Sequence, residues 1–202
     1  MPACADKLVL ESETAKQGQT ISVKIVSEPG QALATESGAP QIEFNGRKFQ
    51  TFALAPSPEQ APGEAKLFGA LIGVPALLKP GNYKLSSGGD CSSVLKVTAA
   101  NFGVQAIRLP KGKDNFDGSP GERTTVDAAK QTVSPQRLWQ GKFGQPCRAR
   151  ISAKFGLRRA VNGRLLPDYF HSGIDFAGAT GTPVKATGKG KVVIAHQGWK
   201  LH

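Results

Sequence analysis

The first half of the chain alternates apolar and polar residues over short stretches separated by turns. Residues 20–26 alternate polar and apolar residues after a Gln17-Gly18-Gln19 turn, which is typical of a half-buried strand. The clearest hairpin joins residues 41–44 to residues 47–54 through Asn45-Gly46, a dipeptide that readily takes the positive φ angles of a two-residue turn. Further strands are predicted over residues 8–10, 65–74, 82–85 and 93–97. About seven short strands at this spacing predict an all-β fold, with an immunoglobulin-like β-sandwich over residues 1–98 that serves as a scaffold.

The second half is less regular. Residues 99–140 are predicted to be a structured linker, with an extended stretch over 102–109 and a short helix over 124–132 that Thr124 or Thr125 caps. Residues 141–202 are turn-rich and form a partial β domain. Val161-Asn162-Gly163-Arg164 predicts a turn there, and two more strands are expected around 183–186 and 190–195.

The composition narrows the class of partner. The formal net charge is +11, which favours an anionic partner such as nucleic acid, membrane or an acidic cell-wall polymer. The sequence contains no zinc finger, basic helix or aromatic-interleaved motif, so nucleic acid is disfavoured. No run is long and apolar enough to span a membrane. A modest basic cluster is made up of Arg148, Arg150, Lys154, Arg158, Arg159 and Arg164.

The N-terminus and the cysteines bear on the compartment. Residues 1–4 do not resemble a secretory signal, so the protein is either cytosolic or carries its signal outside this sequence. Cys4 and Cys91 bracket the first half, and a bridge between them is a hypothesis for an oxidising compartment. Cys147 would then lack a partner in this chain.

His171 and Asp175 are the best candidate metal ligands in the chain. Imidazole and carboxylate both bind zinc. In a straight strand the two Cα atoms would lie about 13 Å apart at roughly 3.3 Å per residue, too far to share one ion comfortably. A bend or bulge at Gly173 would bring the pair together. The alternative from these residues alone is a partly buried His that is hydrogen-bonded to an Asp.

The motifs around this pair resemble those of lysostaphin-type (LytM-like) zinc metallopeptidases, which cleave peptide cross-links of bacterial peptidoglycan. The resemblance covers roughly residues 141–202. It is carried, in order, by Ser152-Ala153-Lys154-Phe155-Gly156-Leu157-Arg158-Arg159, Asn162-Gly163, His171-Ser172-Gly173-Ile174-Asp175-Phe176-Ala177, Gly181-Thr182-Pro183-Val184-Lys185-Ala186 and Gly188-Lys189-Gly190-Lys191-Val192-Val193.

The resemblance implies zinc held by His171 and Asp175, peptidoglycan as the partner, and secretion to the periplasm or cell envelope. The family takes its third ligand and a proton-transfer His from a later His-x-His motif. That motif is absent, since the only histidines after Asp175 are His196 and His202. We therefore expect a catalytic domain whose C-terminal part is missing from this chain and is supplied by a separate segment.

Two other functions remain as alternatives. One is a non-catalytic cell-envelope binding or regulatory protein on a degenerate peptidase fold, and the other is a basic nucleic-acid-binding β protein. Arg158, Arg159 and Arg164 are either a rim that attracts an anionic wall polymer or a solvated surface. Aromatic residues that would line a groove or pack in a core are Tyr169, Phe170 and Trp199.

Overall fold

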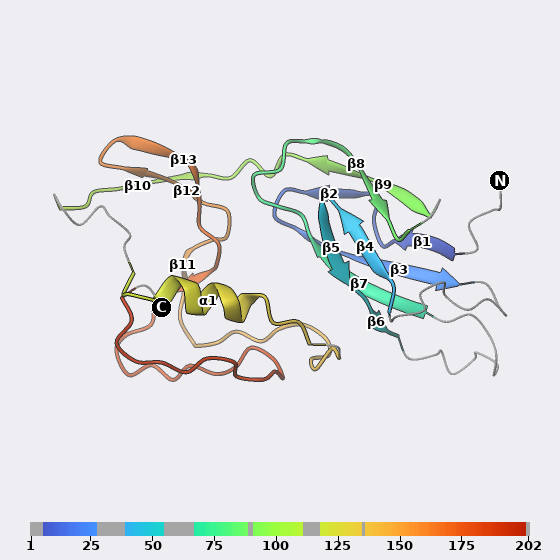
Figure 1. Cartoon of the computed structure of the whole chain (residues 1–202). Helices are drawn as coiled ribbons and strands as arrows, with labels where there is room; N and C mark the ends of the chain where they lie inside the picture. Colours follow the sequence, from blue (N-terminus) through green and yellow to red (C-terminus); the bar gives the residue numbers. More distant parts are fainter. Residues whose placement is uncertain are drawn as a thin grey trace. The chain divides into compact units, whose positions relative to one another are not determined.

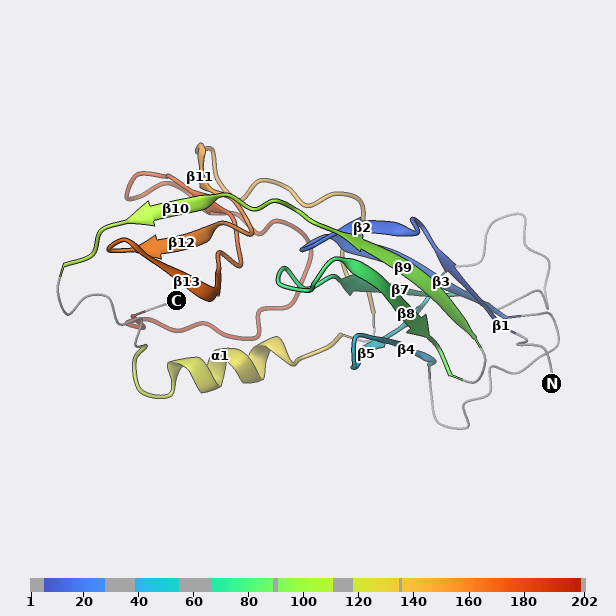
Figure 2. The same ribbon diagram turned by 90° about the horizontal axis from the view of Figure 1, so that it is seen from above.

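A computed structural model describes residues 6–27, 39–54, 67–88, 91–110, 118–134 and 136–200. The chain divides into two compact units, residues 1–101 and 102–202, and each is described by itself. Strands dominate the described residues and one short helix accompanies them, which confirms the all-β prediction (Figures 1 and 2).

Two sheets form the first unit. One has the order β1-β3-β7-β6 and is antiparallel throughout; it contains β1 (Asp6–Leu10), β3 (Thr20–Ser27), β7 (Leu67–Gly73) and β6 (Phe52–Ala53). The other has the order β2-β9-β8-β4-β5; it contains β2 (Thr14–Lys16), β9 (Ser92–Thr98), β8 (Gly81–Ser86), β4 (Gln41–Phe44) and β5 (Arg47–Gln50). Strand β2 pairs in parallel with β9, and the other pairs of this sheet are antiparallel.

Both sheets contribute to one cluster of buried apolar side chains. The alternation seen in the sequence explains this, because every second residue of a strand points to the same face. In β3, for example, Ile21, Val23 and Ile25 are buried. The side chains that the other sheet contributes include Ile42, Phe44, Leu85, Leu95 and Val97.

The predicted Asn-Gly hairpin is confirmed. Asn45 has φ 49° and Gly46 has φ 71°, and they join β4 to β5. The strand expected to run from residue 47 to residue 54 is divided, however, because β5 and β6 belong to different sheets. Thr51 lies at this crossing; it is buried, and its hydroxyl donates a hydrogen bond to the Pro40 carbonyl (2.6 Å).

The second unit contains a three-stranded sheet, a strand pair and the helix. The sheet has the order β10-β12-β13, formed by β10 (Val104–Ile107), β12 (Arg158–Val161) and β13 (Arg164–Phe170). β10 runs parallel to β12, and the predicted Asn162-Gly163 turn joins β12 to β13. A short antiparallel pair is formed by β11 (Ile151–Ala153) and β14 (Asp175–Phe176). The segment expected to be a linker therefore supplies β10 and helix α1 (Glu122–Lys130) to this unit.

The predicted helix forms, but the expected threonine cap is wrong. The cap residue is Gly121, with φ 74°, and it makes no side-chain capping bond. Thr125 lies inside the helix and donates its hydroxyl back to the Gly121 carbonyl (2.9 Å). The Glu122 carboxylate instead accepts a hydrogen bond from the backbone N–H of Ser119 (2.7 Å), two residues before the cap, and so fixes the turn that leads into the helix.

The strands expected around 183–186 and 190–195 are not formed. Residues 144 and 185 make single backbone bonds to Thr187 and Pro146, and no ladder develops from them. Val184 is 78% exposed and Val192 is 80% exposed, so these apolar stretches lack a paired neighbour in the described part of the chain. An apolar run becomes a strand only when another strand is available to take its backbone hydrogen bonds.

Two expectations concern features outside this description. Cys4 lies outside the described residues, so the Cys4–Cys91 bridge stays a prediction; Cys91 itself is 5% exposed. Among the described residues, no helix is long and apolar enough to cross a membrane.

Candidate metal centre

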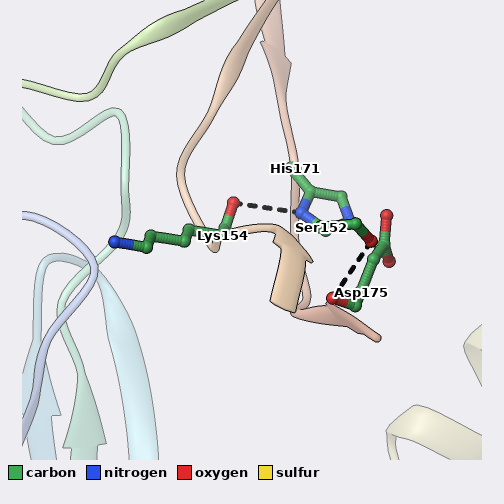
Figure 3. Close-up of polar contacts among 4 residues, drawn as sticks. All are labelled: Ser152, Lys154, His171 and Asp175. Carbon is green, nitrogen blue, oxygen red and sulfur yellow. Dashed lines mark hydrogen bonds and ion pairs between the residues drawn. The ribbon is translucent and has the colours of Figure 1, made fainter. Parts of the chain in front are cut away.

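His171 and Asp175 lie at the two ends of a short bend. His171 directly follows β13, Asp175 opens β14, and the chain bends at Gly173 between them. The bend brings His171 Nε2 to 3.1 Å from Asp175 Oδ1 (Figure 3). The structure thus brings the two residues together through a bend in place of a straight strand. This contact fits both interpretations of the sequence, a pair of metal ligands and a partly buried His that is hydrogen-bonded to an Asp.

The backbone of His171 is held on both sides by the turn at residues 154–157. His171 N–H donates to the Leu157 carbonyl, and Gly156 N–H donates to the His171 carbonyl, both at 2.8 Å. The imidazole is largely enclosed, with 12% of the side chain exposed, whereas the Asp175 side chain is 54% exposed. The ring therefore has a defined place while one side of the pair opens to solvent.

Both ring nitrogens of His171 face oxygen acceptors. Nδ1 lies 3.1 Å from the Lys154 carbonyl oxygen, and Nε2 lies 3.1 Å from the Asp175 carboxylate (Figure 3). A neutral imidazole carries a single N–H, so it can donate to only one of these oxygens. The arrangement is satisfied by a second proton on the ring or by a cation shared between Nε2 and the carboxylate.

The arrangement passes a test of fit for zinc. A ligating His characteristically donates its other N–H to a carbonyl or carboxylate, which is the place that the Lys154 carbonyl takes here. Two ligand atoms about 2.0–2.1 Å from one tetrahedral ion lie roughly 3.3 Å apart, close to the observed separation of Nε2 and Oδ1. The backbone of Asp175 is held by Ser152, whose Oγ donates a hydrogen bond to the Asp175 carbonyl (3.3 Å).

The described residues supply two ligands and not three. Residues 6–200, apart from the undescribed gaps, contain no cluster of three or more His, Cys, Asp or Glu side chains that could hold a metal ion. A catalytic zinc site needs three protein ligands and an open position. The described residues therefore fall one ligand short of a catalytic zinc site.

The arginines predicted to form a rim have different roles. The Arg158 guanidinium donates to the carbonyl oxygens of Tyr169 (3.1 Å), Leu166 (3.4 Å) and Pro167, so it is used within the unit to hold β13. Arg159 lies over the Tyr169 ring at 5.2 Å. Arg164 is exposed, as are Arg148, Arg150 and Lys154. These four are the members of the predicted cluster that can meet a partner.

The three aromatic residues singled out in the sequence have defined ring contacts. Phe170 packs edge-to-face on Phe155 with ring centroids 5.8 Å apart, which is a packing role. Trp199 stacks on His196 at 4.3 Å, and Tyr169 faces Arg159.

The net formal charge of the chain comes from the second unit. Residues 1–101 contain nine Lys+Arg and nine Asp+Glu, whereas residues 102–202 contain 17 Lys+Arg and six Asp+Glu. The whole net charge of +11 therefore belongs to the unit that carries His171 and Asp175.

Two contributors to the site were not identified from the sequence. The Lys154 carbonyl is a backbone group, so no side-chain pattern reports it, and Ser152 acts through a hydroxyl 23 positions from its partner. Both lie in the first of the motifs that carry the family resemblance, and that was the available signal. No protein-family model matches the sequence, and a search of curated proteins finds no match.

Proposed function

We propose that residues 102–202 belong to a lysostaphin-type zinc endopeptidase domain that cleaves peptide cross-links of bacterial peptidoglycan. One observation carries the proposal: an enclosed imidazole has oxygen acceptors 3.1 Å from both of its nitrogens, one of them a solvent-open carboxylate. A cation between Nε2 and Asp175 is one of the two ways to satisfy both acceptors, the other being a second proton on the ring. The ordered motifs around the pair support zinc as this cation.

The roles of the residues follow from their contacts. His171 would bind zinc through Nε2 and Asp175 through its carboxylate, while the Lys154 carbonyl orients the ring through Nδ1. Bound zinc lowers the pKa of a coordinated water and polarises the scissile carbonyl. The third ligand and the proton-transfer histidine come, in this proposal, from outside the described residues.

The first unit is proposed to be an immunoglobulin-like sandwich that serves as an accessory domain. The orders β1-β3-β7-β6 and β2-β9-β8-β4-β5 match the ABED arrangement and the extended GFC arrangement of that fold. Tyr83 donates its hydroxyl to the Lys79 carbonyl (2.7 Å), as in a tyrosine corner. Two residues later, where antibody domains place a cysteine, stands the fully buried Leu85.

We propose the periplasm or cell envelope as the location and peptidoglycan as the partner. The concentration of +11 on the peptidase-like unit supports an anionic polymer, because a strongly positive surface raises the local concentration of such a partner.

The second candidate is a non-catalytic cell-envelope binding or regulatory protein. The observation that favours it is that the described residues contain two ligands where a catalytic zinc needs three. This candidate predicts wall binding without zinc dependence.

Zinc titration of the 202-residue chain separates the two. We expect one zinc per chain, lost in His171→Ala and Asp175→Ala and retained in the exposed control variants His196→Ala and Asp168→Asn. Millimolar imidazole should tighten binding in the parent chain, because it can occupy the position of the missing histidine ligand. If zinc binding is absent, or is equally strong in His171→Ala and in the parent, the enzymatic proposal fails and the binding protein is favoured.

The reaction itself is tested on purified cross-linked peptidoglycan. Zinc-dependent release of cross-linked peptide is expected once a histidine-bearing C-terminal segment is joined to the chain, and it should vanish in the His171→Ala form. Zinc binding without any release would leave a metal-dependent binding protein.

A further inference from the structure

We propose that Phe102 and Gly156 are positioning residues for the metal pair. They hold the Lys154 carbonyl against Nδ1 of His171, and they thereby direct the Nε2 lone pair toward Asp175. The inference deepens the proposed function and rests on it for its purpose, but the selection of the ring proton is a property of the protein without metal.

The first step is the turn that carries the carbonyl. Leu157 N–H donates to Lys154 O at 3.4 Å and closes the turn, and His171 Nδ1 lies 3.1 Å from the same oxygen. Gly156 takes a left-handed backbone conformation with φ +85°, which residues other than glycine rarely adopt. The direction of the Lys154 carbonyl therefore depends on the conformation at Gly156.

The second step is the ring that covers this turn. A Cβ placed on Gly156 would lie 2.1 Å from both Cδ1 and Cε1 of Phe102, so the ring rests directly on the glycine backbone. Phe102 also packs edge-to-face on Phe155 at 6.1 Å. Phe155 in turn packs on Phe170, the residue before His171, at 5.8 Å. The three rings thus brace both the turn and the backbone next to the ligand.

The third step fixes Phe102 itself. Arg158 N–H donates to the carbonyl of the adjacent Gly103 (2.9 Å), and β10 continues from there alongside β12. A residue 54 positions before Gly156 is in this way anchored on the turn. The contact lies outside the strand ladder, and in this proposal it fixes where the Lys154 carbonyl points.

The consequence is chemical. A carbonyl oxygen only accepts hydrogen bonds, so a fixed Lys154 carbonyl stabilises the tautomer that carries its proton on Nδ1. That tautomer leaves Nε2 unprotonated, as a metal ligand requires. Loosening Phe102 should release the tautomer without removing either ligand.

The test measures the tautomer of His171 by ¹⁵N NMR of histidine-labelled, metal-free protein at alkaline pH, in an Asp175→Ala background. This background removes the competing acceptor and leaves the Lys154 carbonyl as the oxygen that faces the ring. We expect Nδ1–H to dominate there, and a shift to a mixture of tautomers in Phe102→Leu and in Gly156→Ala. Gly163→Ala is the matched control, because Gly163 has φ +84° and open space around a Cβ.

A second readout is zinc affinity in the chain that retains Asp175. Phe102→Leu should weaken zinc binding by about 10- to 100-fold, the usual effect of losing an outer-shell partner, and Phe143→Leu should leave it unchanged. Phe143 is a 60% exposed phenylalanine of the same unit.

The outcomes separate the two proposals. If Phe102→Leu is folded and His171 keeps the same Nδ1–H fraction as in the Asp175→Ala background, the positioning role is overturned. A low Nδ1–H fraction in the Asp175→Ala variant itself, with Phe102 and Gly156 unchanged, would overturn the positioning role too. If no variant binds zinc but the tautomer shifts as expected, the positioning role stands and the metallopeptidase proposal fails. Should Gly156→Ala not fold, Phe102→Leu decides.

Discussion

At the scale of single residues, two glycines near the metal pair face different demands. Gly156 has a left-handed φ and a phenyl ring against its backbone, whereas Gly173 has no such φ and nothing within 4 Å of a Cβ. The bend at Gly173 therefore does not require glycine. Alanine in a compatible conformation restricts the unfolded chain and stabilises proteins by roughly 0.4–1 kcal/mol.

We accordingly predict that Gly173→Ala keeps the zinc site and does not lower the free energy of unfolding. Chemical denaturation and zinc titration of the variant check this. A large loss of stability or of zinc binding would mean that the bend needs a conformation that only glycine provides.

Residues of this site differ in how far the sequence reveals them. His171 and Asp175 were identified because their side chains carry the chemistry and stand four positions apart. The Lys154 carbonyl and the Phe102 ring were not identified. The first is a backbone atom, and the second meets Gly156 only because β10 pairs with β12, a contact that no local pattern encodes.

At the scale of elements, the Asn162 side chain adds to the backbone bond from Asn162 N–H to the Ile107 carbonyl (3.0 Å), which joins the β12–β13 turn to β10. Asn162 accepts a hydrogen bond from Leu109 N–H (3.0 Å) and donates its amide to the Leu109 carbonyl (3.2 Å). Its backbone has φ 50°, a conformation that asparagine tolerates better than most residues. Asn162 therefore both makes the turn and extends the hydrogen bonding of β10 beyond Ile107.

Asn162→Ala should destabilise the chain more than Asn45→Ala does. Asn45 has nearly the same φ, 49°, before a glycine, but it makes no side-chain hydrogen bond among the described residues. The difference between the two losses in free energy of unfolding is the contribution of the two Asn162–Leu109 hydrogen bonds, for which about 1–2 kcal/mol is expected. Denaturant unfolding gives the difference, and faster amide exchange at Leu109 would locate it. Equal losses of stability in the two variants would show that the Asn162–Leu109 hydrogen bonds add none.

The buried Glu122 carboxylate anchors the start of helix α1 through hydrogen bonds. Glu122 is 0% exposed, and it accepts hydrogen bonds from Ser119 N–H (2.7 Å) and Lys200 N–H (3.0 Å), which are 81 positions apart. A carboxylate in this setting holds the start of the helix and a distant segment at once. Removal would leave enclosed backbone donors without their acceptor, which is more costly than losing a solvated contact.

Glu122→Ala is therefore predicted to lower the free energy of unfolding by about 3 kcal/mol. Asp127→Ala is the comparison within the same helix, because Asp127 is 62% exposed and lies 3.9 Å from Lys130. Its effect should stay within about 0.5 kcal/mol. Thermal unfolding of both variants measures the contrast, and similar losses would argue against a special role for Glu122.

Elements set by local turn chemistry were predicted well, and those that need a distant partner were not. The Asn45-Gly46 and Asn162-Gly163 turns have the positive φ angles that their sequences favour. The apolar stretch 190–195 was also predicted to be a strand, yet it forms no ladder in the described chain. Whether a stretch becomes a strand depends on a second strand that lies next to it in space. The hydrogen bond between Glu122 and Lys200 likewise joins residues far apart in the chain, and no sequence pattern signals it.

At the scale of the whole molecule, the charge is divided between a neutral first unit and a second unit of +11. If an anionic wall polymer is the partner, as proposed, its attraction should arise from the second unit. Attraction between exposed charges weakens as salt shortens the Debye length from about 10 Å at 0.1 M. The position of the charge can therefore be tested separately from its amount.

Two matched triple variants of the full chain make this test. Arg148→Glu/Arg150→Glu/Lys189→Glu alters exposed residues of the second unit, and Lys24→Glu/Lys84→Glu/Lys96→Glu alters exposed residues of the first. Each lowers the net charge by the same amount, so a response to total charge alone would be identical. We expect the first set to reduce sedimentation with purified peptidoglycan several-fold at low salt and the second set to change it little, with the difference vanishing near 1 M salt. Equal losses would place the attraction in net charge, and no loss in either would remove electrostatics from wall binding.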